Sequence, residues 1–196
     1  MSDKIKEMIE EIEAMKVKLG EEIAQHEKYI SYEIQNGCVR FEKEVLDKQK
    51  ENMKNLLSWF RDIPLLHLLT SPLIYAMVVP AILFDMLLFL YQKIIFGIYK
   101  FEFVKRSDYI IFDRQYLGYL NVIEKISCMY CSYFNGLMHY ASAIVNRTEL
   151  YFYPIKHAKK IAYQHDYYDE FLVYGDEDEY QKKLEELRKK FQKNDL

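Results

Sequence analysis

One apolar stretch constrains this chain more than any other feature. It runs from Pro72 to Tyr91, about twenty residues, and contains one charged side chain, Asp85. A helix of that length crosses the roughly 30 Å hydrocarbon core of a bilayer. Apolar residues continue on both sides, over residues 64–99, and aromatic residues typical of membrane interfaces flank the stretch: Trp59, Phe60, Tyr91 and Tyr99. The pattern predicts a membrane segment, and the alternative is a buried central helix of a soluble bundle.

Two prolines leave the path of this segment open. Pro72 and Pro80 lack the backbone N–H that a helix interior uses, and membrane helices tolerate this where neighbouring groups satisfy the freed carbonyl. One arrangement is a single kinked span, and the other is a re-entrant hairpin over residues 64–98 that breaks near Pro80. More cations follow the segment than precede it, so a true span would leave its C-terminal side in the cytoplasm.

Asp85 needs a reason to lie in such a stretch. A carboxylate within a bilayer costs several kcal/mol unless it is protonated or paired, so it usually faces protein or water. Asp85 is therefore either a functional ionisable group or a tolerated one. A single segment forms no pore unless the chain oligomerises, so a lone Asp is weak evidence for transport.

Residues 1–60 form a charged N-terminal region. From Asp3 to about Ile34, apolar residues recur every three or four positions between Glu and Lys, which predicts an amphipathic helix of coiled-coil character: Ile5, Met8, Ile12, Met15, Leu19 and Ile23. A second charged segment, 39–55, is expected to be helical and to fold back on the first as a helical hairpin. These helices either pack on each other or bind a protein partner or a second copy of the chain.

Composition excludes several classes of function. Lys plus Arg minus Asp plus Glu is 27 − 30 = −3 over 196 residues, which argues against a general nucleic-acid binder. No phosphate-binding loop, dinucleotide fingerprint, Gly-x-Ser-x-Gly or His-Glu-x-x-His occurs. Three cysteines are too few for a disulfide scaffold, and the start of the chain lacks the apolar core of a signal peptide, which predicts a reducing compartment.

A stripe of polar and thiol side chains marks the helix expected to begin near Arg114. Asn121, Glu124, Cys128, Cys131 and Asn135 recur at spacings of three and four, so they share one face. Leu or Ile would be ordinary on a buried face, and potential ligands there need an explanation. Three fit: two small residues that allow close packing, a Zn or Fe ion bound by the thiolates, or a redox dithiol.

A metal site would need a turn after the cysteines. In one unbroken helix to residue 153, Cys131 and His157 would lie about 39 Å apart and could not share an ion. Asn135-Gly136 is the expected helix stop, and a helix returning from Leu137 would bring Glu149 near Glu124. No Glu-x-x-His motif is present, which argues against a di-iron site of the usual type.

Four motifs resemble those of a family of small bacterial membrane-associated proteins with no established activity. They are Ser-Asp-Tyr-Ile-x-Phe-Asp-Arg from Ser107, Tyr-Leu-Asn-x-Ile-Glu-Lys from Tyr119, Cys-x-Tyr-Cys-Ser-Tyr-x-Asn-Gly-Leu from Cys128 and Arg-Thr-Glu-x-Tyr-x-x-Pro-Ile-Lys-His-Ala from Arg147. The resemblance covers roughly residues 72–174. Family members usually carry Cys at the position of Tyr153, which implies a four-ligand set in them and one ligand fewer here.

These observations predict an all-α protein. Its expected parts are the charged helices of 1–60, the hydrophobic membrane segment 64–99, a helical module 105–174 that faces the cytoplasm, and a charged C-terminal helix 176–196. The expected location is the bacterial inner membrane, with the lipid bilayer as the first partner. Two functions are open. One is a membrane-anchored metalloprotein of unknown reaction, with Zn or Fe held by Cys128, Cys131 and His157 and assisted by Glu124 or Glu149. The other is a non-enzymatic scaffold or assembly factor whose cysteines are structural.

Overall fold

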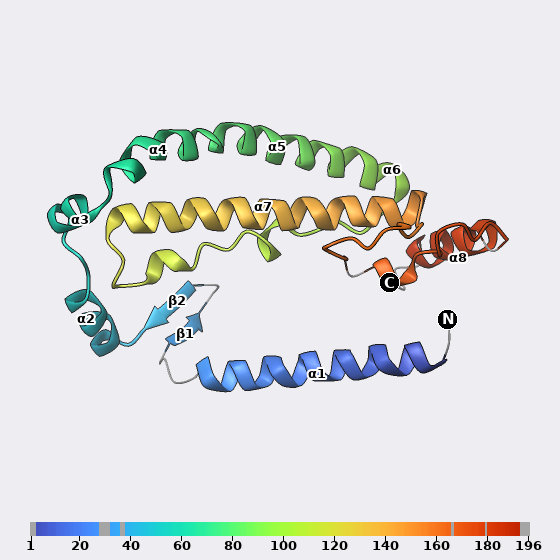
Figure 1. Cartoon of the computed structure of the whole chain (residues 1–196), viewed down its shortest axis with the longest axis horizontal. Coiled ribbons are helices and arrows are strands. Elements are labelled where there is room, and N and C mark those ends of the chain that lie inside the picture. The colour runs from blue at the N-terminus through green and yellow to red at the C-terminus, as the bar shows by residue number, and fades with distance from the viewer. Residues whose placement is uncertain (1–2, 28–31, 36–37, 166, 179, 193–196) are drawn as a thin grey trace.

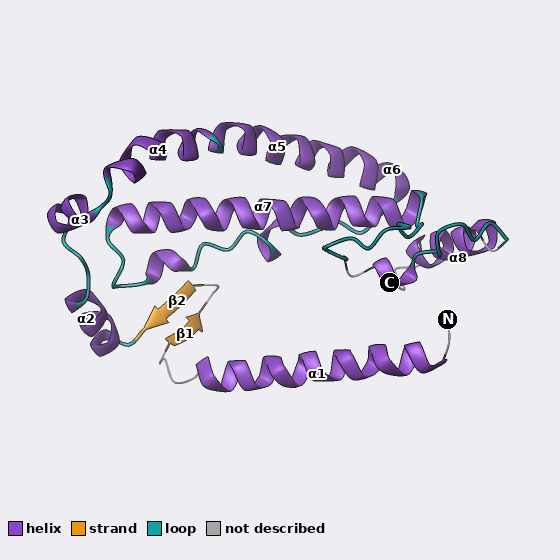
Figure 2. Ribbon diagram, viewed as in Figure 1, coloured by secondary structure: helices purple, strands orange, loops and turns teal. Residues whose placement is uncertain are grey.

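The computed structural model describes residues 3–27, 32–35, 38–165, 167–178 and 180–192. The all-α prediction is confirmed in part: helices make up most of the molecule, and the described residues also contain one pair of short strands (Figure 2). Two long helices lie side by side, one apolar (green in Figure 1) and one amphipathic (yellow to orange). The N-terminal helix α1 and the C-terminal helix α8 lie outside this pair.

The N-terminal region is not the helical hairpin that the sequence predicts. After α1 (Asp3–Glu27), strands β1 (Tyr32–Gln35) and β2 (Cys38–Phe41) pair antiparallel, with Tyr32 opposite Phe41. Only then does the second charged helix begin, as α2 (Lys43–Glu51). Alternating aromatic and β-branched residues explain the strands, because this period of two suits a pleated strand better than a helix.

The apolar segment is one continuous helix, so the re-entrant hairpin broken near Pro80 is wrong. After the short α3 (Leu56–Asp62), α4 (Leu65–Ala76), α5 (Val78–Tyr91), a π-helical turn (Gln92–Phe96) and α6 (Gly97–Tyr99) form a single path of 35 residues. We call Leu65–Tyr99 the apolar helix. Inside it, the Ser71 hydroxyl donates to the Leu68 carbonyl at 2.9 Å, the carbonyl that Pro72 leaves without its helical donor. The local repair explains why the helix continues.

Residues 100–121 return along the helix pair, and we call them the return segment. Lys100 adopts a left-handed conformation with φ of 59°, which ends the apolar helix. The return segment contains only short 3-10 turns, at Arg106–Asp108 and Arg114–Tyr116. The helix predicted to begin near Arg114 therefore begins eight residues later, as α7 (Val122–Phe152).

A capping box explains where α7 begins. The Asn121 side-chain oxygen accepts hydrogen bonds from the backbone N–H groups of Ile123 and Glu124, each at 3.0 Å. The Glu124 carboxylate in turn accepts from the Asn121 N–H at 2.9 Å. This reciprocal arrangement satisfies donors that a helix start leaves free, which explains why α7 begins after Asn121 and not near Arg114.

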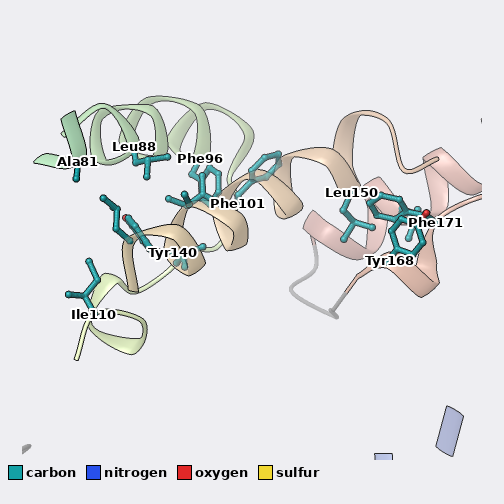
Figure 3. Close-up of a cluster of buried hydrophobic side chains, with 14 residues drawn as sticks. Ala81, Leu88, Phe96, Phe101, Ile110, Tyr140, Leu150, Tyr168 and Phe171 are labelled. Atoms are coloured by element: carbon teal, nitrogen blue, oxygen red, sulfur yellow. The ribbon is translucent and has the colours of Figure 1, made fainter. Parts of the chain in front are cut away.

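The apolar helix and α7 run in the same direction. Tyr75 contacts Ser127, Asp85 contacts Tyr133, Gln92 contacts Tyr140 and the Tyr99 ring contacts the Tyr151 ring edge-on, so contacts advance together along both helices. Ala81, Leu88 and Phe96 point from the apolar helix toward α7, where Tyr140 lies opposite them (Figure 3). The segments 64–99 and 105–174 therefore share one hydrophobic core.

The C-terminal part packs on the end of α7. Ile155 forms a parallel bridge with Leu172, a 3-10 turn follows at Tyr168–Glu170, and α8 (Tyr180–Gln192) lies near the C-terminal end of α7 in Figure 1. The Arg188 side chain of α8 donates to the Tyr151 carbonyl at 3.1 Å. Leu150, Tyr168, Phe171 and Leu187 complete the core there.

Candidate membrane-binding surface

The outer face of the apolar helix is an extended apolar surface. Of its most apolar 18 residues, 11% are buried. Large apolar side chains are exposed from one end to the other: Leu65, Leu66, Leu69, Leu73, Met77, Val79, Leu83, Met86, Leu87, Leu90, Ile94 and Ile98. Soluble proteins rarely expose a continuous apolar patch of such length, and where one occurs it marks a membrane or protein contact. We call this set the outer face.

The inner face of the same helix has a different composition. Residues that are not exposed recur every three or four positions and face α7: Ser71, Tyr75, Val78, Ala81, Asp85, Leu88, Gln92 and Phe96. This spacing is the seam expected where two helices pack side by side. All polar groups of the seam find partners on α7, in the helix itself or in the return segment.

Asp85 lies in this seam and is paired. The Arg106 guanidinium of the return segment donates from Nε to both carboxylate oxygens at 3.2 Å and from a terminal nitrogen to Oδ2 at 2.7 Å. The Tyr133 hydroxyl of α7 donates to the same Oδ2 at 3.1 Å. We call Asp85, Arg106 and Tyr133 the polar clamp. Since its members come from three segments, the clamp joins the apolar helix, α7 and the return segment.

A second, fully buried hydrogen-bonded group lies two turns further along. The Tyr140 hydroxyl donates to the Gln92 side-chain oxygen at 2.6 Å, and the Gln92 amide donates to the Val104 carbonyl at 3.1 Å. Gln92 and Tyr140 are only 3% and 2% exposed, so leaving either group without its partner would cost the desolvation penalty of a buried polar group. The same three segments meet here as at the clamp.

The clamp changes the acidity of two of its members. Hydrogen bonding to Asp85 raises the pKa of Arg106, because the charged guanidinium is stabilised by the carboxylate. Burial raises the pKa of Tyr133, and its hydrogen bond to Asp85 adds to the rise. Burial likewise raises the pKa of Tyr140. Both tyrosines therefore stay neutral hydrogen-bond donors over the physiological range.

Three of the five predicted metal ligands, Glu124, Cys128 and Cys131, lie on the first half of α7. Cys128 is half-buried and Cys131 is exposed, one helical turn apart, and both are free thiols. Glu124 is occupied in the capping box with Asn121. The first half of α7 thus offers two thiols on consecutive turns.

The other predicted ligands lie at the far end of α7. The helix does not stop at Asn135-Gly136, and that prediction is wrong: α7 runs unbroken to Phe152. Glu124 and Glu149 are therefore about 38 Å apart along the helix, and exposed His157 lies beyond its end. Glu149 lies instead near His165, with 3.8 Å between the carboxylate and ring nitrogen.

The structure does not assemble the five predicted ligands into one site. Among the described residues, no three Cys, His, Asp or Glu side chains form a group that suits a metal ion. Zn or Fe binding stays a prediction for the five residues Cys128, Cys131, His157, Glu124 and Glu149. Within one chain, the two cysteines are the predicted ligands that remain close enough to bind one ion together. Tyr153, at the position where the sequence resemblance implies a Cys in other proteins, is 68% exposed.

Sequence reasoning missed the partners of Asp85. An isolated carboxylate in an apolar run signals that a cation or donor lies nearby, but nothing local identifies Arg106, 21 residues later, or Tyr133, 48 residues later. Gln92 is a second polar side chain in the apolar helix, seven residues after Asp85 and therefore on the same face, so it too indicated that a polar partner lies nearby. Tyr140 reaches Gln92 only because α7 continues through Gly136, which the sequence did not predict.

Comparison with known proteins adds no assignment to this geometry. No protein-family model, curated protein or solved structure matches the chain.

Proposed function

We propose that this protein is a membrane-anchored helical scaffold, attached to a lipid bilayer by the outer face of its apolar helix. The observation that supports this most directly is the exposure of large apolar side chains along the whole length of that face, while Asp85 and Gln92 of the same helix lie in the seam. Burying large apolar side chains in lipid stabilises by roughly 25 cal/mol per Å² of apolar area removed from water. A dozen such side chains are ample for stable attachment.

The N-terminal helix is the partner-binding element of the proposal. Met8, Ile12, Met15, Leu19 and Ile23 of α1 are each about half exposed or more, and they form a stripe at three- and four-residue spacing between charged residues. Such a stripe is typical of a helix that pairs with another helix, from a partner protein or a second copy of the chain. The scaffold function is thus membrane attachment at one face and helix pairing at another.

The bacterial inner membrane is the location that we propose. It rests on the sequence resemblance, and it places α7 and the C-terminal part on the cytoplasmic side.

Flotation with lipid vesicles tests the attachment. Purified protein is transferred from detergent to phosphatidylcholine and phosphatidylglycerol vesicles and centrifuged through a density gradient. We expect the protein to float with the vesicles and to remain bound after a carbonate wash. The double variant Leu73→Glu with Leu83→Glu, which places two charges on the outer face, should lose most of this flotation.

The matched control is Met15→Glu, which places a charge on an equally exposed apolar residue of α1 and should float like the parent. The proposal is overturned if the parent chain stays monodisperse in buffer without detergent and sediments away from vesicles, because the outer face would then have no need of lipid.

A further inference from the structure

We infer that the apolar helix lies in the plane of the membrane, inside one leaflet, rather than crossing the bilayer. This inference rests on the proposed membrane attachment and specifies its geometry. The outer face points into the lipid, while α7 and the return segment lie on the aqueous side. Three observations support it: the length of the outer face, the direction of α7 and the position of the charged side chains of the return segment.

Length is the first observation. From Leu65 to Tyr99 the helix is about 51 Å long at 1.5 Å per residue, whereas the hydrocarbon core is about 30 Å thick. Leu65 and Leu66 near one end are 70% and 68% exposed, and Ile98 near the other is 67% exposed. A span that covered both ends would need a tilt of about 54°, well beyond the roughly 0–40° seen for spanning helices. An in-plane helix covers the whole face at once.

The direction of α7 is the second observation. Two parallel neighbouring helices that both cross a bilayer need a connection that crosses it too. Here the connection is the return segment, which has no regular helix beyond two short 3-10 turns and whose backbone would lack hydrogen-bond partners in lipid. In Figure 1 it passes on the side of α7 that faces away from the apolar helix for most of its course. Crossing is therefore costly, and an in-plane pair avoids it.

The position of the charges is the third observation. The Arg106 guanidinium pairs with Asp85, which lies well away from both ends of the apolar helix. The Arg106 side chain is 46% exposed. Lys105 and Asp108 beside it are exposed as well. If the helix crossed the bilayer with Asp85 inside it, these charges would enter the hydrocarbon core at several kcal/mol each. With the helix in the plane, they face water.

Depth-dependent fluorescence quenching tests the inference. Trp59 is the single tryptophan, so Trp59→Phe supplies a silent background. Single tryptophans are then placed on the outer face by Leu66→Trp, Leu83→Trp and Ile98→Trp, and each protein is bound to vesicles whose lipids carry bromine either high or low on the acyl chain. We expect the same ratio of shallow to deep quenching at all three positions.

A spanning helix gives a different pattern, with Leu83→Trp quenched by deep bromines and at least one end position quenched little or not at all. That result, in protein that floats with vesicles, overturns the in-plane placement and leaves the membrane attachment intact. Absence of quenching at all three positions together with loss of flotation of the parent overturns both. Leu19→Trp on α1 is the control, and its fluorescence should be unaffected by either lipid.

Discussion

At the scale of single residues, Gly136 shows how a local signal is overruled. Asn135-Gly136 is typical of a helix end, yet α7 continues, because a tertiary contact uses the missing side chain. A Cβ at Gly136 would lie 2.5 Å from the Tyr109 carbonyl oxygen and 2.9 Å from Cα of Ile110. The glycine therefore allows the return segment to pack its backbone directly on the helix.

We predict that Gly136→Ala destabilises the protein although alanine is the better helix former. The gain in helix propensity is about 1 kcal/mol, while overpacking against backbone atoms costs about 1–3 kcal/mol and opens the contact between α7 and the return segment. Thermal unfolding in detergent, followed by circular dichroism, should show a lower Tm. Asn135→Ala, at an exposed position one residue away, should leave Tm unchanged or raise it slightly. A Tm for Gly136→Ala above that of the parent would contradict the packing described here.

At the scale of elements, the length of α7 decides what its thiols can do. Cys128 and Cys131 share a face, as helical spacing predicts, but the same unbroken helix separates them from Glu149 and His157. Spacing rules hold along one helix because its geometry repeats. They say nothing about a ligand beyond the end of the helix, whose position depends on how the chain turns.

We therefore predict that His157→Ala leaves zinc binding unchanged. Zinc titrated into the purified, reduced protein should bind His157→Ala and the parent with the same stoichiometry and affinity. Cys128→Ser removes one of the two thiolates that one chain offers on consecutive turns, so it should abolish any zinc that the parent retains. Metal analysis after gel filtration measures both. A loss of zinc in His157→Ala would show that a second copy of the chain, or another arrangement of this one, brings His157 to the cysteines.

At the scale of the whole molecule, the polar clamp connects three segments that are far apart in the sequence. Asp85, Arg106 and Tyr133 close the seam near its middle, and Gln92 and Tyr140 close it again two turns later. Side chains that unite several elements in this way couple their stability, because removing one partner leaves the others desolvated and incompletely bonded.

This coupling predicts a loss of stability in alkali. Tyr133 has a raised pKa in the folded state, so the unfolded chain loses this proton first as the pH rises. Its contribution to stability is complete below the ordinary tyrosine pKa of 10.0 and is lost as the pH rises through the higher folded value. Unfolding free energies in denaturant from pH 8 to 11.5 should fall more steeply for the parent than for Tyr133→Phe, which has no phenol to ionise there. Identical slopes would contradict the clamp.

Sequence periodicity and composition were enough to identify the mostly helical chain, the apolar segment and its unusual carboxylate, because these follow from local spacing and from the cost of exposing apolar side chains. They failed where a contact between distant segments decided the outcome. Residues 32–35 and 38–41 paired as strands, Gly136 continued a helix, and Asp85 paired with Arg106 from another segment. The relative direction of the two long helices, and the face of the apolar helix that remains exposed, also depend on distant contacts. Both follow from the path of the chain between the helices, and that path is set only when the whole molecule packs.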